Sequence, residues 1–313
     1  MSYHSPVLLT ESIDGLSINP DGIYVDVTFG GGGHSRSILQ QLSERGRLYA
    51  FDQDSDALAN NINDNRFTLI HENFKYLKSF LRLEGVRKID GLLADLGVSS
   101  HQFDEGQRGF SIRFDAALDL RMDQRQKQTA KDIVNSESET RLKEILSLYG
   151  EMPNAGRIAN AIVAARQQKT IETTFELCKA VEKYIPRNQE NKYLAMMFQA
   201  LRIEVNAELE ALEMMLKQAV DILNPGGRLV VISYHSLEDR MVKNLIKSGN
   251  IEGNIEKDFY GNMITSLKPI TRKPITPSDE ELQENNRSRS AKLRIAEKII
   301  TKYNILFIYI LLK

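Results

Sequence analysis

Short apolar runs alternate with stretches of helical spacing over the first hundred residues. The runs are four or five residues long and predict buried strands at residues 24–27, 48–51, 67–71 and 91–94. Helices are predicted between them, at residues 35–42 and 56–62, the second with Ser55 as a possible N-cap. Strands separated by helices require crossover connections, so this part of the chain predicts an α/β fold with a parallel sheet.

The pattern changes after this region. Between residues 129 and 206 only helical spacing occurs, and a further amphipathic stretch follows at residues 209–223. A β-prone run at 228–233 then resumes the sheet. We therefore expect one α/β domain in two parts, interrupted by an all-helical insert. The predicted boundaries are 1–104 and 207–298 for the α/β domain, 105–206 for the insert and 299–313 for an atypical apolar tail.

Composition narrows the class of protein. Of 313 residues, 42% are hydrophobic and 27% charged, which is typical of a globular protein with a sizeable core. The single cysteine, Cys178, excludes an intramolecular disulfide and favours a reducing compartment. The N-terminus lacks a signal-peptide pattern, and the apolar run at 305–312 is too short to span a bilayer. We expect a cytoplasmic protein without a membrane association.

The most informative local pattern is a glycine-rich turn after the first strand. Asp26 ends the strand, and four glycines at 30–33 precede the predicted helix. Asp52 ends the next strand, where a carboxylate can accept hydrogen bonds from a ribose. Nicotinamide enzymes share this layout, but Ser35 replaces the third glycine of their motif. A pyrophosphate would be repelled by Asp26, whereas the ammonium group of S-adenosylmethionine would be attracted.

Asp95 ends the fourth strand, so three carboxylates follow successive strands. Ligands of open α/β sheets bind beyond the carboxyl ends of the strands. This placement favours a methyltransferase. A nicotinamide oxidoreductase, a non-catalytic RNA-binding module and a purely structural glycine turn remain alternatives.

Eight segments together resemble the MraW/RsmH family of bacterial 16S rRNA cytosine-N4 methyltransferases. They cover roughly residues 3 to 298. They are YHSPVLL (3–9), DVTFGGGGHS (26–35), DGLLADLGVSS (90–100), RGFS (108–111), LDLRMD (118–123), FQALRI (198–203), ISYHSLEDR (232–240) and NRSRSAKLR (286–294).

The resemblance implies a Rossmann-like class I methyltransferase sheet with an inserted helical domain. It also implies S-adenosyl-L-methionine as cofactor, no metal, and as partner the 16S rRNA of the small ribosomal subunit, methylated at N4 of a cytidine in the decoding centre. The oligomeric state stays open. By motif, the implied cofactor contacts are Gly32, Gly33, His34, Asp52, Phe74, Asp95 and Gln102.

Two residues are candidates for the chemistry itself. Many amino-methyltransferases hold the target amine with a D/N/S-P-P-aromatic motif, and Asp95 begins the equivalent stretch, which has no prolines. We predict Asp95 or the adjacent carbonyl groups as the acceptor. His235, next to Ser236, could face the target base, but a capped turn into the following helix is an equal alternative.

The C-terminal part of the chain is locally basic. We predict that Arg287, Arg289, Lys292 and Arg294 contact RNA phosphates, although an ordinary solvated surface is an alternative. Cys178 lies in a predicted helix of the insert, among apolar neighbours. We expect it to be a buried structural residue rather than a nucleophile.

Overall fold

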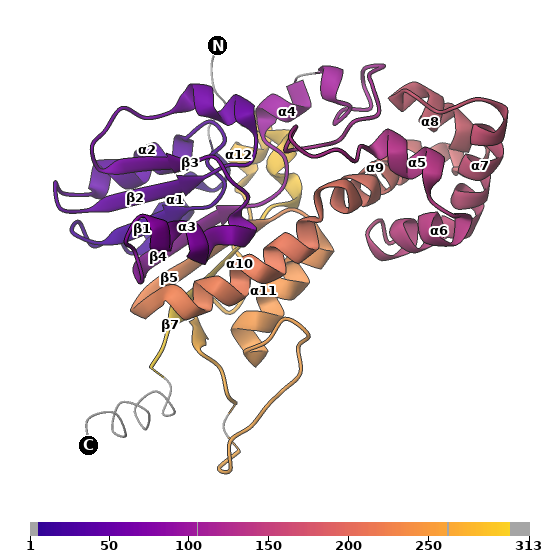
Figure 1. The fold of residues 1–313 in the computed structure, drawn as a ribbon. Coiled ribbons are helices and arrows are strands. Elements are labelled where there is room, and N and C mark those ends of the chain that lie inside the picture. The colour runs from indigo at the N-terminus through magenta and orange to yellow at the C-terminus, as the bar shows by residue number, and fades with distance from the viewer. Residues whose placement is uncertain (1–5, 105, 262, 301–313) are drawn as a thin grey trace. The chain divides into compact units, whose positions relative to one another are not determined.

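The structure is a computed structural model that describes residues 6–104, 106–261 and 263–300. It divides into two compact units (Figure 1). The described residues up to 97 and from 210 onward form the first unit, and those from 98 to 209 form the second. The chain thus leaves the first unit after Gly97 and returns to it at Glu210, whereas the sequence predicts these boundaries after residues 104 and 206.

Among the described residues, seven strands form one sheet in the order β3-β2-β1-β4-β5-β7-β6. All neighbouring pairs are parallel except those of β7, which runs antiparallel to β5 and β6. This order, with the reversed β7, is that of Rossmann-like class I methyltransferases. The strands are β1 (Ile23–Asp26), β2 (Arg47–Phe51), β3 (Phe67–Ile70), β4 (Ile89–Asp95), β5 (Leu223–Ser233), β6 (Leu267–Pro269) and β7 (Lys292–Lys298).

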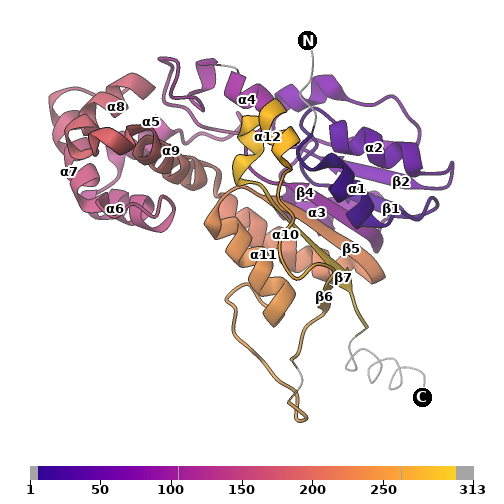
Figure 2. The ribbon, with the colours of Figure 1, turned by 180° about the vertical axis from the view of Figure 1, so that it is seen from behind.

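Helices cover both faces of this sheet. Buried side chains of α3, α10 and α11 pack on one face, and those of α1 and α2 pack on the other (Figures 1 and 2). Because a parallel sheet is buried on both sides, its strands are apolar almost throughout. The helices of the first unit are α1 (Leu9–Leu16), α2 (Gly33–Gln41), α3 (Leu77–Leu83), α10 (Glu208–Ile222), α11 (Ser236–Ser248) and the short α12 (Asp279–Glu284).

The second unit is helical, as the spacing predicts. Its core contains fully buried residues from α5 to α9, among them Ile133, Leu142, Ile158, Leu177 and Leu201. These helices are α4 (Ser100–Asp104), α5 (Ala130–Ser136), α6 (Glu139–Leu148), α7 (Ala155–Gln168), α8 (Thr174–Val181) and α9 (Glu190–Asn206).

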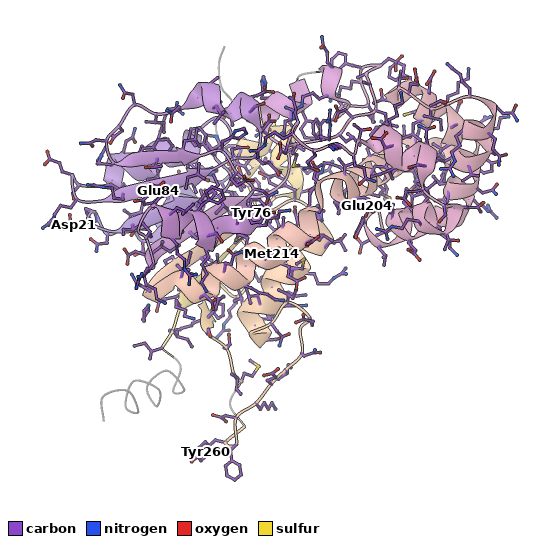
Figure 3. All side chains as sticks on the ribbon, in the orientation of Figure 1. Asp21, Tyr76, Glu84, Glu204, Met214 and Tyr260 are labelled. Atoms are coloured by element: carbon purple, nitrogen blue, oxygen red, sulfur yellow. The ribbon has the colours of Figure 1, made fainter. Side chains whose placement is uncertain are left out.

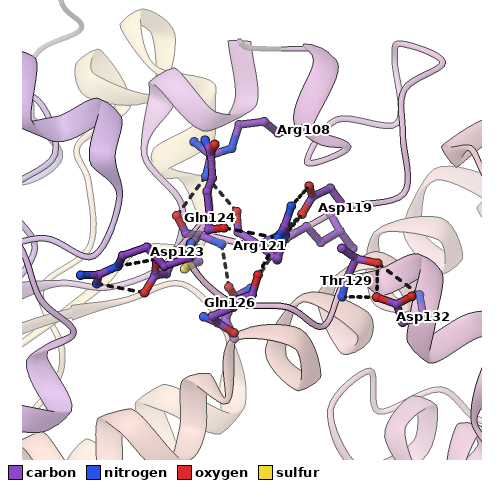
Figure 4. Close-up of polar contacts among 12 residues, drawn as sticks. Arg108, Asp119, Arg121, Asp123, Gln124, Gln126, Thr129 and Asp132 are labelled. Carbon is purple, nitrogen blue, oxygen red and sulfur yellow. Dashed lines mark hydrogen bonds and ion pairs between the residues drawn. The ribbon is translucent and has the colours of Figure 1, made fainter.

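Polar contacts order the segment that leads into α5 (Figure 4). Arg121 donates from Nε and Nη2 to the two carboxylate oxygens of Asp119, at 2.7 and 2.8 Å. Thr129 and Asp132 then form a capping box, which supplies partners for amide groups that the first helical turn leaves free. These contacts fix the loop at the point where it enters α5.

Three local features differ from the sequence prediction. Residues 55–60 form the 3-10 helix η1 (Ser55–Asn60), and Asp54 caps it, so the N-cap assignment to Ser55 is wrong. Strand β5 begins at Leu223 rather than at residue 228, with an irregular register before Gly91 of its partner. The basic segment at 292–298 is a strand, whereas the sequence suggested only a surface motif.

No helix in the described part of the chain is long and apolar enough to cross a membrane. The apolar run at 305–312, like the first residues of the YHSPVLL motif, lies outside the described residues.

Candidate active site

The glycine turn joins β1 to α2 in a conformation that needs glycine. Gly32 is the N-cap of α2 and has a φ of 74°, in the left-handed region that residues with a Cβ rarely adopt. A Cβ on Gly33 would lie 2.2 Å from Cγ of Pro6. The backbone can therefore pass this close to its neighbours, or to a ligand, only without side chains at these two positions.

Asp26 stabilises this turn by accepting hydrogen bonds from residues of the turn and of α2. Its side chain is buried, and its Oδ2 accepts a 2.7 Å hydrogen bond from the hydroxyl of Ser35. Oδ1 accepts from the amide of Thr28 at 3.1 Å. Burial raises the pKa of Asp26, while nearby His34 and these hydrogen bonds act in the opposite direction. An ammonium contact from Asp26 stays a prediction, since only 1% of the residue is exposed.

Asp52, at the end of β2, is bonded to the same turn. Its Oδ2 accepts from the Gly30 amide at 2.7 Å, and its Oδ1 accepts from the Asp54 amide at 2.9 Å. A carboxylate offers about four lone-pair sites, so capacity for ribose hydroxyls remains. Burial is the main cause that raises the pKa of Asp52 to about 6. Asp52 can thus shape the turn and bind a ligand at the same edge of the sheet.

Asp95 lies at the carboxyl end of β4, between β1 and β5 in the sheet. The hydroxyl of Tyr234 donates to its Oδ1 at 2.7 Å, and Nδ1 of His34 lies 3.9 Å from its Oδ2. The Asp95 side chain is 23% exposed, so a ligand can reach it. Burial raises the pKa of Asp95 to about 6, although His34 and Tyr234 favour the charged form. Asp95 is thus a reachable carboxylate with a pKa close to neutrality.

His34 and Tyr234 complete this cluster. His34 is 5% exposed, and its Nε2 lies 3.2 Å from the carbonyl oxygen of Val7, which only accepts. Burial and the Asp95 carboxylate raise the pKa of Tyr234 well above its usual value, so its hydroxyl keeps its proton and donates. The sequence motif contained Tyr234, but nothing in the local pattern marked it as a partner of Asp95.

Two further residues predicted to bind the cofactor have contacts of their own. Phe74 begins the 3-10 helix η2 (Phe74–Tyr76) after β3 and is half-buried against the sheet core. Gln102 belongs to α4 of the second unit. Its side-chain Oε1 accepts from the backbone amide of Ser99, and its backbone amide donates to the Ser99 hydroxyl. Their cofactor contacts stay predictions.

His235 is built into the start of α11. It is the N-cap residue, with its Nδ1 3.4 Å from the Glu238 amide, and its Nε2 lies 3.2 Å from Oε1 of Glu238. Its side chain is only 7% exposed. These contacts are those of the capped-turn alternative, and a direct role of His235 with the target base stays a prediction.

The four cations proposed for RNA differ in their surroundings. Arg294 donates from Nε and Nη2 to the two oxygens of Asp239, at 2.6 and 3.1 Å. Lys292 Nζ lies 3.8 Å from the same carboxylate. Arg287 and Arg289 are exposed in the 3-10 helix η6 (Asn286–Ser290). Asp239 therefore neutralises part of the positive charge that is predicted from the sequence to contact RNA phosphates.

Cys178 lies in α8 and packs against the core of the second unit, but it is only partly buried rather than buried as predicted. Burial is the main cause that raises the pKa of its thiol to about 11. At neutral pH the thiolate is thus scarce, and the thiolate is the nucleophilic form. Carbon-5 methylation of cytosine needs such a nucleophile, so this geometry disfavours it.

We therefore expect Cys178→Ala to retain full methyl-transfer activity and to lose about 1 kcal/mol of folding stability. Turnover assays and thermal unfolding of the purified variant measure the two effects. Complete loss of turnover in a folded Cys178→Ala protein would show that the thiol takes part in the reaction.

This chain is similar to known proteins over nearly its whole length. The family model described as the MraW methylase family matches residues 1–299. The ribosomal RNA small subunit methyltransferase H of Flavobacterium johnsoniae is 57% identical over 96% of this chain and 99% of its own length. The protein of the same name from Bacteroides thetaiotaomicron is 57% identical over 95% of this chain and 98% of its own. A putative rRNA methylase structure from Clostridium thermocellum aligns with a TM-score of 0.45 at 14% identity, covering 96% of this chain and all of that one. From the match over nearly its whole length, this chain belongs to the MraW methylase family.

Proposed function

We propose that this protein transfers a methyl group from S-adenosyl-L-methionine to the N4 amine of a cytidine in the decoding centre of 16S rRNA, in the cytoplasm. Family membership and relatives named as small-subunit rRNA methyltransferases support the reaction class and the kind of RNA. The observation that carries the chemical part is the reachable Asp95 carboxylate at the end of β4, held by Tyr234 beside the glycine turn.

The residues of the site fit the cofactor. The glycine turn leaves space for close approach, and Asp52 offers a carboxylate where ribose hydroxyls would lie. We expect Phe74, which follows β3, to flank the adenine. When bound, S-adenosylmethionine supplies a methyl group already activated by its sulfonium charge. The protein then has to orient the amine and keep competing water away.

Asp95 is the residue we assign to the target amine. The lone pair of an exocyclic amine is delocalised into the cytosine ring, and a carboxylate that accepts its hydrogen makes the nitrogen more nucleophilic. The Tyr234 bond occupies Oδ1, which leaves Oδ2 for the substrate. Tyr234 is therefore a positioning residue that fixes the acceptor and helps to keep it ionised.

Replacing Tyr234 with phenylalanine tests that role through pH. The groups that act on Asp95 are His34, Tyr234, Asp26 and Glu238, and the tyrosine hydroxyl lowers its pKa. Loss of a hydrogen bond to a charged group should raise that pKa by roughly one unit. Because the carboxylate is the active form, kcat of Tyr234→Phe should fall near pH 6 and recover above pH 8. An equal loss of kcat at every pH would assign Tyr234 a purely structural role.

Ligand-induced stabilisation separates the proposal from its two alternatives. A ligand that binds only the folded state raises the melting temperature. Adenosylhomocysteine should do so, and NAD should not. Stabilisation by NAD alone would favour an oxidoreductase, and binding of RNA without binding of adenosylhomocysteine would favour a non-catalytic RNA-binding module.

A further inference from the structure

A depression of about 280 Å³ lies on the first unit, where α11 meets the β6–β7 edge of the sheet. Ile246 of α11 and Pro269 at the end of β6 contribute apolar wall. Its other lining residues include four cations and no carboxylate, and the cations are Lys243, Lys247, Arg272 and Arg294. This concentration of positive charge is unlike the balanced composition of the chain as a whole, whose net charge is −1.

Among the residues that the structure describes, Arg294 is the one cation of this depression with an ion-pair partner. Arg294 is bound by both oxygens of Asp239. Within the described residues, no ion pair involves Lys243, Lys247 or Arg272, although Lys243 lies close enough to Asp239 to help lower the pKa of that carboxyl. Lys243 and Lys247 are four residues apart on α11, a spacing that places like charges side by side and destabilises an isolated helix. The depression is therefore a place where an anion would relieve repulsion.

The helix dipole explains part of this arrangement of cations. A lysine in the last helical turn interacts favourably with the helix dipole, and Lys247 has that position. Lys243 lies one turn earlier, and Arg272 comes from the segment after β6, so the dipole explains neither. The convergence of two elements on one hollow indicates a site for an extended anion rather than a helix-end effect.

We propose that this depression binds the phosphodiester backbone of the RNA substrate, as a second contact apart from the methyl-transfer site. The inference rests on the proposed function. Helix α11 begins directly after β5, at the carboxyl edge of the sheet where Asp95 lies. With a rise of about 1.5 Å per residue, Lys243 and Lys247 lie about 10 and 16 Å along α11 from its start. RNA that presents its base at that edge can thus continue along α11.

The loop between α11 and β6 lies next to the cationic depression, but we do not include it in the proposed RNA contact. The loop between α11 and β6 projects away from the sheet, with Tyr260 at its tip (Figure 3). Phe259 and Tyr260 are 98% and 82% exposed, which would suit base stacking. The same loop carries Glu252, Glu256 and Asp258, whose charges repel phosphates. The proposed contact is therefore confined to the cationic depression.

The test compares the double variant Lys243→Ala/Lys247→Ala with the parent protein. The probe is the small ribosomal subunit from cells that lack this protein, and binding is measured across a range of salt concentrations. Loss of two phosphate contacts should weaken binding roughly 10- to 30-fold at 0.1 M salt and reduce the log–log salt slope by about 1.4 to 1.8. KM for the subunit should rise, while kcat and adenosylhomocysteine affinity stay unchanged.

The matched control is Lys179→Ala/Lys183→Ala, which removes two exposed lysines with the same spacing from the second unit. We expect it to bind the subunit more tightly than the α11 variant. An unchanged salt slope in the α11 variant, or an equal loss in both variants, would overturn the proposed contact and leave the proposed function intact. A parent protein that binds no subunit at all would contradict both.

Discussion

Asp95→Ala should lower kcat by about 100- to 1000-fold, the usual loss when a preorganised group that stabilises the transition state is removed. The effect should fall on kcat because the carboxylate gains its bond as the amine becomes a nucleophile. Single-turnover methylation with saturating cofactor measures it. In the parent, the rate should rise as pH increases through about 6, where the Asp95 carboxyl loses its proton.

Asp95→Asn is the matched variant, since it keeps the size of the side chain and an oxygen for the Tyr234 hydroxyl. It should remove the rise in rate near pH 6 and keep part of the activity. A kcat near that of the parent in both variants would assign the acceptor to a backbone carbonyl. A loss confined to cofactor affinity would instead make Asp95 a cofactor ligand only.

Asp52→Ala should weaken the binding of adenosylhomocysteine by about 10- to 150-fold, which corresponds to the 1.5–3 kcal/mol of a hydrogen bond to a charged group. The structure adds a second reason, because the same carboxylate holds the Gly30 amide in the turn. Isothermal titration calorimetry on the folded variant measures the affinity.

Asp14→Ala removes an exposed carboxylate from α1 of the same unit and serves as the control. It should bind adenosylhomocysteine as the parent does. If Asp52→Ala also binds normally while folded, the ribose contact is wrong and Asp52 has only a structural role in the turn.

Local sequence patterns predict the elements whose apolar residues are contiguous or regularly spaced along the chain. The strands at 24–27 and 48–51 appear as β1 and β2, and the helical spacing at 194–205 falls within α9. These segments are decided by burial of contiguous apolar residues, which is visible in a short window. At residues 56–62 the spacing predicts an ordinary helix, whereas the structure has the 3-10 helix η1 over Ser55–Asn60 with Asp54 as its N-cap.

The missed features depend on pairing between distant segments. Tyr234 and Asp95 are 139 residues apart and meet only because β4 and β5 are neighbours in the sheet. Strand β7 had a detectable signal, since buried Leu293 and Ile295 alternate with Lys292 and Arg294. The positive charge of the segment instead led to the prediction of an RNA contact. Asp239, which neutralises Arg294, lies in the separate ISYHSLEDR motif, and the contact between the two motifs is not visible in either of them.

Product analysis tests the proposed activity most directly. The protein is incubated with labelled S-adenosylmethionine and small ribosomal subunits from cells that lack it, and the labelled nucleoside is identified and mapped in the RNA. We predict N4-methylcytidine at one position in the decoding centre of 16S rRNA. A 5-methylcytidine product, label in another RNA, or no transfer to the subunit would contradict the proposed reaction.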